Sequence, residues 1–129
     1  MTVNNLTIYK TIRINKMGKR EEKIETMIAE AKKLGLVISD ELMSKVAIGL
    51  GPVLYNKNAD TVACGQVTEL ETVKENFLKK KLGLTLSDEE LNIAIKEVCQ
   101  ALGTSNRNKK RVHFYALLVM KFDKESIYA

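Results

Sequence analysis

Four basic residues near the C-terminus are the clearest candidates for chemistry in this chain. They are Arg107, Lys109, Lys110 and Arg111. Closely spaced cations of this kind attract phosphate groups, so the cluster could contact nucleic acid. It also falls at the start of a predicted helix, where the helix macrodipole disfavours positive charge. The cluster is therefore either a solvated face that is paired with acidic residues elsewhere in the chain or a contact for an anion or nucleic acid, and we favour the solvated face.

The single histidine and the two cysteines give little support to catalysis or metal binding. Cys64 and Cys99 are far apart in the sequence, and His113 has no second histidine at a metal-binding spacing. A serine or cysteine nucleophile would need His113 as its base, and no G-x-S-x-G motif supports one. Because His113 lies in an apolar run, we expect a partly buried histidine with a hydrogen-bond partner. The sequence predicts no catalytic residue, no metal site and no cofactor.

The two cysteines are also too few for the disulfide framework of a small secreted protein. The N-terminus has no signal-peptide pattern, and no apolar run approaches the roughly 20 residues of a membrane span. We therefore expect a cytoplasmic protein that does not enter the membrane, with both cysteines present as reduced thiols.

The basic character of the chain is concentrated at its N-terminus. The chain has 21 basic and 16 acidic residues, a net charge of +5. Residues 1–20 hold five basic residues and no acidic one, so residues 21–129 are neutral overall. Residues 1–16 also lack a helical period, and we predict a flexible basic extension there, with residues 17–129 as a single helical domain. Met17 is a candidate for the natural start of the protein, and a flexible tail is the alternative.

A repeated ten-residue sequence predicts the helices that would position these residues. Residues 32–41 read KKLGLVISDE and residues 80–89 read KKLGLTLSDE, with eight of ten positions identical. Lysines followed by glycine are typical of a helix C-terminus, and Ser-Asp-Glu is typical of a helix N-terminus. Each copy therefore predicts a helix–turn–helix corner, and together they predict an all-α fold. Duplication and shared capping chemistry both remain open as the origin of the repeat.

Apolar periodicity and capping signals predict a compact bundle of five to six helices. Four helices are expected over residues 21–34, 40–50, 68–82 and 87–102, and a short one over 59–63. The helix over 68–82 would start at a Thr68–Glu71 capping box. A last helix would run from Ser105 or Asn106 to about Lys121, and its apolar middle predicts a central helix surrounded by the others.

Several short motifs resemble one known family. They are the segment 49–60, the segments 73–78 and 82–84, Ser105-Asn106-Arg107, Phe114-Tyr115 and Lys121-Phe122. Together they are similar to the small bacterial proteins grouped as domain of unknown function 2853, from about residue 17 to the C-terminus. The resemblance implies an all-α bacterial domain. It carries no activity and no catalytic residues to transfer.

The sequence therefore favours a non-enzymatic binding or protein-interaction domain with an unidentified protein partner. Nucleic-acid binding through the basic cluster is the alternative. An enzyme ranks third, because no catalytic constellation is recognisable.

Overall fold

The computed structural model describes residues 18–57 and 59–128, and this part of the chain contains five α-helices. They are α2 (Lys19–Lys33), α3 (Asp40–Leu50), α4 (Val67–Thr72), α5 (Asp88–Ala101) and α6 (Arg111–Lys121). Two short 3-10 helices are η1 (Gly51–Tyr55) and η3 (Glu125–Tyr128). The segment η2 (Val73–Lys81) is a π-helix. The described residues form no strand, only an isolated bridge. The predicted all-α class is confirmed. The predicted extension over residues 1–16 lies outside the described residues.

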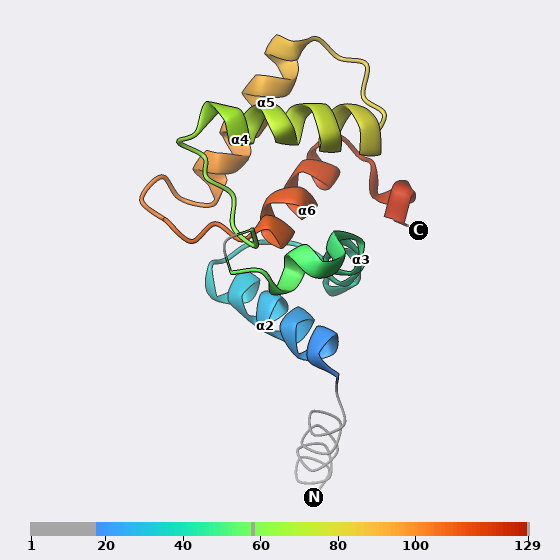
Figure 1. Ribbon diagram of the computed structural model, residues 1–129, viewed down its shortest axis with the longest axis vertical. Coiled ribbons are helices and arrows are strands. Elements are labelled where there is room, and N and C mark those ends of the chain that lie inside the picture. The colour runs from blue at the N-terminus through green and yellow to red at the C-terminus, as the bar shows by residue number, and fades with distance from the viewer. Residues whose placement is uncertain (1–17, 58, 129) are drawn as a thin grey trace, which may run out of the picture.

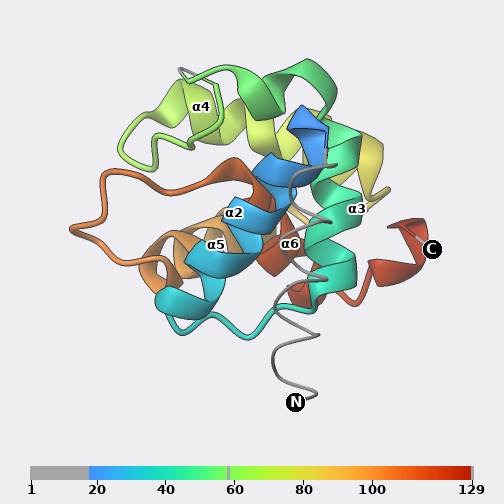
Figure 2. The same ribbon diagram turned by 90° about the horizontal axis from the view of Figure 1, so that it is seen from below.

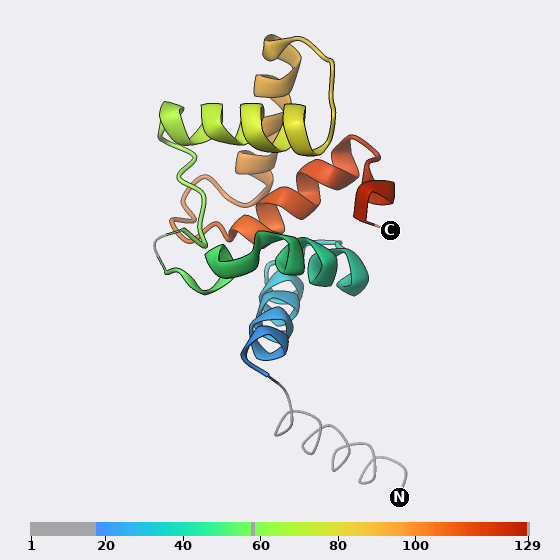
Figure 3. The same ribbon diagram turned by 45° about the vertical axis from the view of Figure 1, so that its right-hand side comes forward.

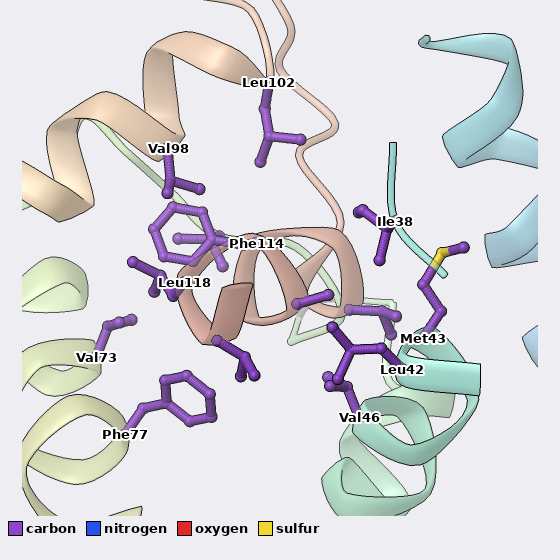
Figure 4. Close-up of a cluster of buried hydrophobic side chains, with 14 of the residues drawn as sticks. Ile38, Leu42, Met43, Val46, Val73, Phe77, Val98, Leu102, Phe114 and Leu118 are labelled. Carbon is purple, nitrogen blue, oxygen red and sulfur yellow. The ribbon is translucent and has the colours of Figure 1, made fainter. Parts of the chain in front are cut away.

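Helix α6 lies at the centre, with α4 and α5 on one side and α2 and α3 on the other (Figure 1). In the view from below, α2 and α3 lie side by side in front of it (Figure 2). Phe114 and Leu118 of α6 are fully buried and project between two apolar walls (Figure 4). Leu42 and Val46 belong to the α3 wall, and Val98 to the α5 wall. The apolar middle of α6 is thus covered on opposite sides, as the sequence predicted.

The two repeated corners form as predicted. Gly35 and Gly83 have φ values of 76° and 69°, in the left-handed region that favours glycine. Ser39 and Ser87 then cap the following helices, accepting hydrogen bonds from backbone N–H groups at 3.1 and 3.2 Å. The two corners differ in burial. Leu34 of the first corner is 50% exposed, whereas its counterpart Leu82 in the second is 2% exposed. Similar local chemistry therefore serves one shallow and one buried corner.

The helix predicted over residues 68–82 differs from the observed one in its start and its winding. It begins at Val67 after Gln66, and Glu71 does not complete a capping box, because its carboxylate accepts a hydrogen bond from Lys74 Nζ at 2.8 Å. After Thr72 the chain continues as a π-helix. The buried apolar residues of this stretch recur every four or five positions, a spacing that i→i+5 hydrogen bonds keep on one face. They are Val73, Phe77, Leu78 and Leu82.

The region before α6 also differs from the prediction. Asn106 does not start the helix, because its side chain bonds locally to Asn108 N–H at 2.9 Å and to the Leu102 carbonyl at 3.0 Å. Helix α6 begins only at Arg111. The short helix predicted over 59–63 is absent, and Thr61 instead bridges to Lys110. The connection from α3 to α4 therefore runs beside the loop that leads into α6 (Figure 3).

Replacing Gly35 or Gly83 by alanine should lower the free energy of unfolding by about 1 kcal/mol. Both glycines have positive φ, while a Cβ at either would meet open space, so the cost is conformational. Gly65→Ala is the matched control, because its Cβ also meets open space and its φ lies outside the left-handed range. The control should change stability by less than about 0.5 kcal/mol in denaturant unfolding. Equal losses at all three positions would contradict the role of the corners.

Candidate functional site

The predicted basic cluster is dispersed by the fold, and Arg111 is used inside the protein. Its guanidinium donates to the carbonyls of Ala59 at 2.7 Å and Thr61 at 3.0 Å, to the Glu69 carboxylate and to the Tyr115 hydroxyl at 3.2 Å. Its side chain is only 13% exposed. These bonds fasten the α3–α4 connection and α4 to the first turn of α6, so Arg111 acts as a structural clamp.

Lys109 and Lys110 are also engaged. The Lys110 ammonium lies 3.7 Å from the Asp60 carboxylate, which Lys23 of α2 approaches at 3.4 Å. Asp60 is itself buried and accepts both cations at the junction of three segments. Lys109 is buried and donates from Nζ to the carbonyl of Asn106. Acidic residues and carbonyls of this chain therefore compensate these charges. The pairing with acids was expected, but Lys109 and Lys110 are largely buried and do not form the expected solvated face.

Arg107 is the exposed member of the cluster. It lies in the loop between α5 and α6, and within residues 18–57 and 59–128 no ion pair or hydrogen bond is assigned to it. The structure thus leaves one of the four predicted cations directed to solvent and uses three in packing. Nucleic-acid binding through these residues stays a prediction that would depend mainly on Arg107.

His113 is fully buried, deeper than the sequence predicted, and it has the expected hydrogen-bond partner. Its Nε2 lies 2.8 Å from the Met27 carbonyl of α2. A carbonyl only accepts, so Nε2 carries the proton and Nδ1 has a free lone pair, for which the described residues offer no partner. Burial lowers the pKa of His113, while the bond to Met27 and the charge of Glu30 act in the opposite direction. The histidine is thus a neutral link between α6 and α2.

An ion-pair network fastens the π-helix to the start of α5. Lys74 of η2 is almost completely buried and lies 2.8 Å from Glu71 and 3.6 Å from Asp88. Lys79, one turn later, lies 2.7 Å from the same Asp88 and 2.8 Å from Glu75. The hydrogen bond from Lys79 lowers the pKa of the Asp88 carboxyl, and Lys74 adds to the effect. The network holds the α4–η2 helix at a set position across α5.

A groove remains between α4 and α5 in the arrangement that this network imposes. We call it the α4–α5 groove, and its volume is about 280 Å³. Its lining is mainly apolar with a few polar groups, contributed by Cys64, Val67, Leu70, Glu71, Asn92, Ile95, Lys96 and Cys99. Val67 is 75% exposed at its edge. No sequence signal pointed to this groove, because its two sides come from segments that meet only in the folded chain.

A disulfide joins Cys64 and Cys99 at this groove, with a Cα–Cα distance of 6.1 Å. The expectation of two reduced thiols was therefore wrong. It rested on the small number of cysteines and the absence of an export signal, and neither shows whether two cysteines 35 residues apart meet in the fold. Cys64 lies in the turn before α4 and Cys99 in the last part of α5, and the packing of these segments brings the sulfurs together.

Neither a metal-binding cluster nor a membrane-spanning helix is found among the described residues. No group of three or more histidine, cysteine, aspartate or glutamate side chains in residues 18–57 and 59–128 could hold a metal ion. In the same part of the chain, every helix is too short or too polar for a membrane span.

Comparison with known protein families identifies a match over most of the chain. The family described as "Protein of unknown function (DUF2853)" matches residues 26–126. No curated protein matches the chain.

Replacing Arg111 by methionine should lower the free energy of unfolding by about 3 kcal/mol, because it leaves two backbone carbonyls and Glu69 without their donor. Arg107→Met is the matched control and should change stability by less than about 0.5 kcal/mol. Denaturant unfolding of both variants measures the difference. A mild effect at position 111 would show that the clamp is dispensable.

The stabilising contribution of neutral His113 should be lost at low pH. The unfolded chain protonates this residue below about pH 6.5, while the folded chain resists protonation because the pKa is lowered. This contribution is therefore full above pH 6.5 and declines as the pH falls through that value towards the folded pKa. Between pH 7.5 and 5, the denaturant midpoint should fall more for the natural protein than for His113→Leu. Equal falls would rule out His113 as the cause.

Proposed function

The chain belongs to the family described as protein of unknown function (DUF2853), and, since that family supplies no activity, we propose that the protein is a non-enzymatic interaction domain. Its α4–α5 groove binds an apolar segment of a partner protein. One observation carries this proposal: an open, mainly apolar groove with Val67 exposed at its edge. Small apolar hollows with a polar rim are the usual form of a binding site.

The composition of the groove supports a protein partner. Val67 is exposed and Leu70 partly exposed, so both offer an apolar surface, and Glu71 and Lys96 place one charge of each sign among the lining residues. A cluster of one charge sign, which phosphate binding requires, is missing from that lining. The hollow between α2 and α3 is larger, at about 430 Å³, but its lining holds four carboxylates. Three of them lie in first helical turns, where the macrodipole already explains them.

We place this interaction in a bacterial cytoplasm. The family resemblance and the composition of the chain support this location. The disulfide makes the location depend on the redox behaviour of the bond. In a reducing cytosol, disulfides are usually transient and either catalytic or redox-sensing. A permanent Cys64–Cys99 bond in the native host would instead indicate an oxidising compartment.

A charge placed in the groove should abolish partner binding. Val67→Glu puts a carboxylate at the first position of α4, where the helix dipole tolerates it, so the fold should survive. Val37→Glu is the matched control, because Val37 is 86% exposed and lies in the α2–α3 corner, outside the groove lining. The natural protein and the two variants are each cross-linked to their partners in the native host as full chains. Quantitative mass spectrometry then compares the proteins that each of them captures.

We expect a partner that Val37→Glu retains and Val67→Glu loses at least tenfold. A partner that both variants retain, or no partner for the natural protein, would contradict the proposal. Recovery of nucleic acid that Arg107→Glu loses would instead favour the basic cluster, because phosphate contacts depend on the exposed cation. Circular dichroism of each variant confirms that the fold is intact.

A further inference from the structure

We infer that Cys64–Cys99 is a redox-active disulfide that exchanges with dithiol reductants entering through the α4–α5 groove. The inference concerns the sulfurs themselves, so it holds whether or not a partner protein binds the groove. It assigns a chemical role to two residues that interaction alone leaves unexplained.

Access is the first observation. Both cysteines line the groove, so the bond faces a space that a small dithiol can enter. The two sulfurs differ in exposure, because Cys99 is buried on α5 while Cys64 is partly exposed in the turn before α4. A backbone hydrogen bond from Gln66 N–H to the Ala63 carbonyl closes that turn at 3.0 Å, and its neighbours Ala63 and Gly65 are exposed. An incoming thiolate therefore reaches Cys64 first.

Charge is the second observation. Lys96 lines the same groove and lies one helical turn before Cys99, a spacing that brings Cβ atoms to about 5–6 Å. No ion pair is assigned to Lys96 within the described ranges, whereas Glu71 across the groove is neutralised by Lys74 at 2.8 Å. A nearby free cation stabilises a thiolate and favours its departure as a leaving group. Lys96 thus acts as a positioned charge for the Cys99 sulfur.

The exchange follows from this asymmetry. A thiolate of the dithiol attacks Cys64 Sγ, the S–S bond breaks, and its electron pair leaves on Cys99 Sγ as a thiolate. The second thiolate of the dithiol then attacks the dithiol's own sulfur in the mixed disulfide and releases Cys64 as a thiolate. The dithiol becomes a cyclic disulfide and loses two electrons and two protons. The protein gains both, as two thiols.

The fold should survive this step, because other contacts hold the segment before Cys64. Asp60 pairs with Lys23 and Lys110, Arg111 holds the carbonyls of Ala59 and Thr61, and Val62 N–H donates to the Lys109 carbonyl at 2.9 Å. Reduction therefore frees the turn at 63–66, while the Arg111–Glu69 pair still holds α4 and the rest stays in place. The end wall of the groove changes from fixed to mobile.

Reduction of the full chain by dithiothreitol without denaturant tests the inference. Alkylation with N-ethylmaleimide, followed by mass spectrometry, counts free thiols at successive times. We expect no alkylation before reduction and two alkylated thiols after it, with the helical circular dichroism retained. Lys96→Gln should slow reduction about twofold to threefold, because the leaving thiolate loses its cation. Lys33→Gln, an exposed lysine on α2, is the control and should leave the rate unchanged.

The single-cysteine variants identify the attacked sulfur. Cys64 in Cys99→Ser should react with 5,5′-dithiobis(2-nitrobenzoate) at least tenfold faster than Cys99 in Cys64→Ser, because it is the more exposed thiol. Reduction that occurs only in guanidinium would show a buried cross-link and overturn the inference. Free thiols before reduction would do the same, and equal effects of Lys96→Gln and Lys33→Gln would remove Lys96 from it. These measurements need no partner protein, so their outcome is independent of the outcome of the Val67→Glu experiment.

Discussion

The guanidinium of Arg111 is the interaction on which the rest of the arrangement depends. It gathers two carbonyls of the α3–α4 connection and the Glu69 carboxylate of α4 at the first turn of α6. Residues 56, 57 and 59–66 of this connection belong to no helix or strand, so they have few ladder bonds of their own. Its polar backbone must therefore be satisfied from outside, and a planar side chain with five donors is suited to that task.

This clamp also resolves a conflict in the charge pattern. Lys110 and Arg111 lie at the N-terminus of α6, where a helix dipole disfavours cations. Asp60 and Glu69 offset them, and both come from segments more than 40 residues earlier in the chain. The same cations that resemble an anion-binding cluster in the sequence are thus links between chain segments. These basic residues are neighbours in the sequence, but they do not form a basic patch on the surface.

The α4–α5 groove follows from the same geometry. Arg111 sets where α4 begins, the Lys74–Asp88 network sets how η2 crosses α5, and the disulfide fastens the end between them. Two polar contacts and one covalent bond thus hold the α4–α5 groove open. Ile95 and Cys99 of its lining belong to the hydrophobic core, and a space of about 280 Å³ remains beside them.

The sequence by itself determined the features that depend on neighbours a few residues away. Ser39 and Ser87 cap helices through bonds to N–H groups three positions on, and Gly35 and Gly83 take a conformation that other residues resist. The middle of α6, which is apolar on nearly every side, likewise predicted a central helix. Such interactions form wherever the chain goes, so they can be read locally. The predicted all-α bundle rested on them and was correct.

Only the tertiary structure decided which distant groups meet. Arg111 bonds to carbonyls 50 and 52 residues away, and Cys64 meets Cys99 across 35 residues. The π-helix belongs to the same class, because its wider winding is favoured by burying Val73, Phe77 and Leu82 on one face against other helices. Capping and periodicity are satisfied within one element, whereas these contacts need the packing of several. That is the physical reason why the bundle could be predicted and the groove could not.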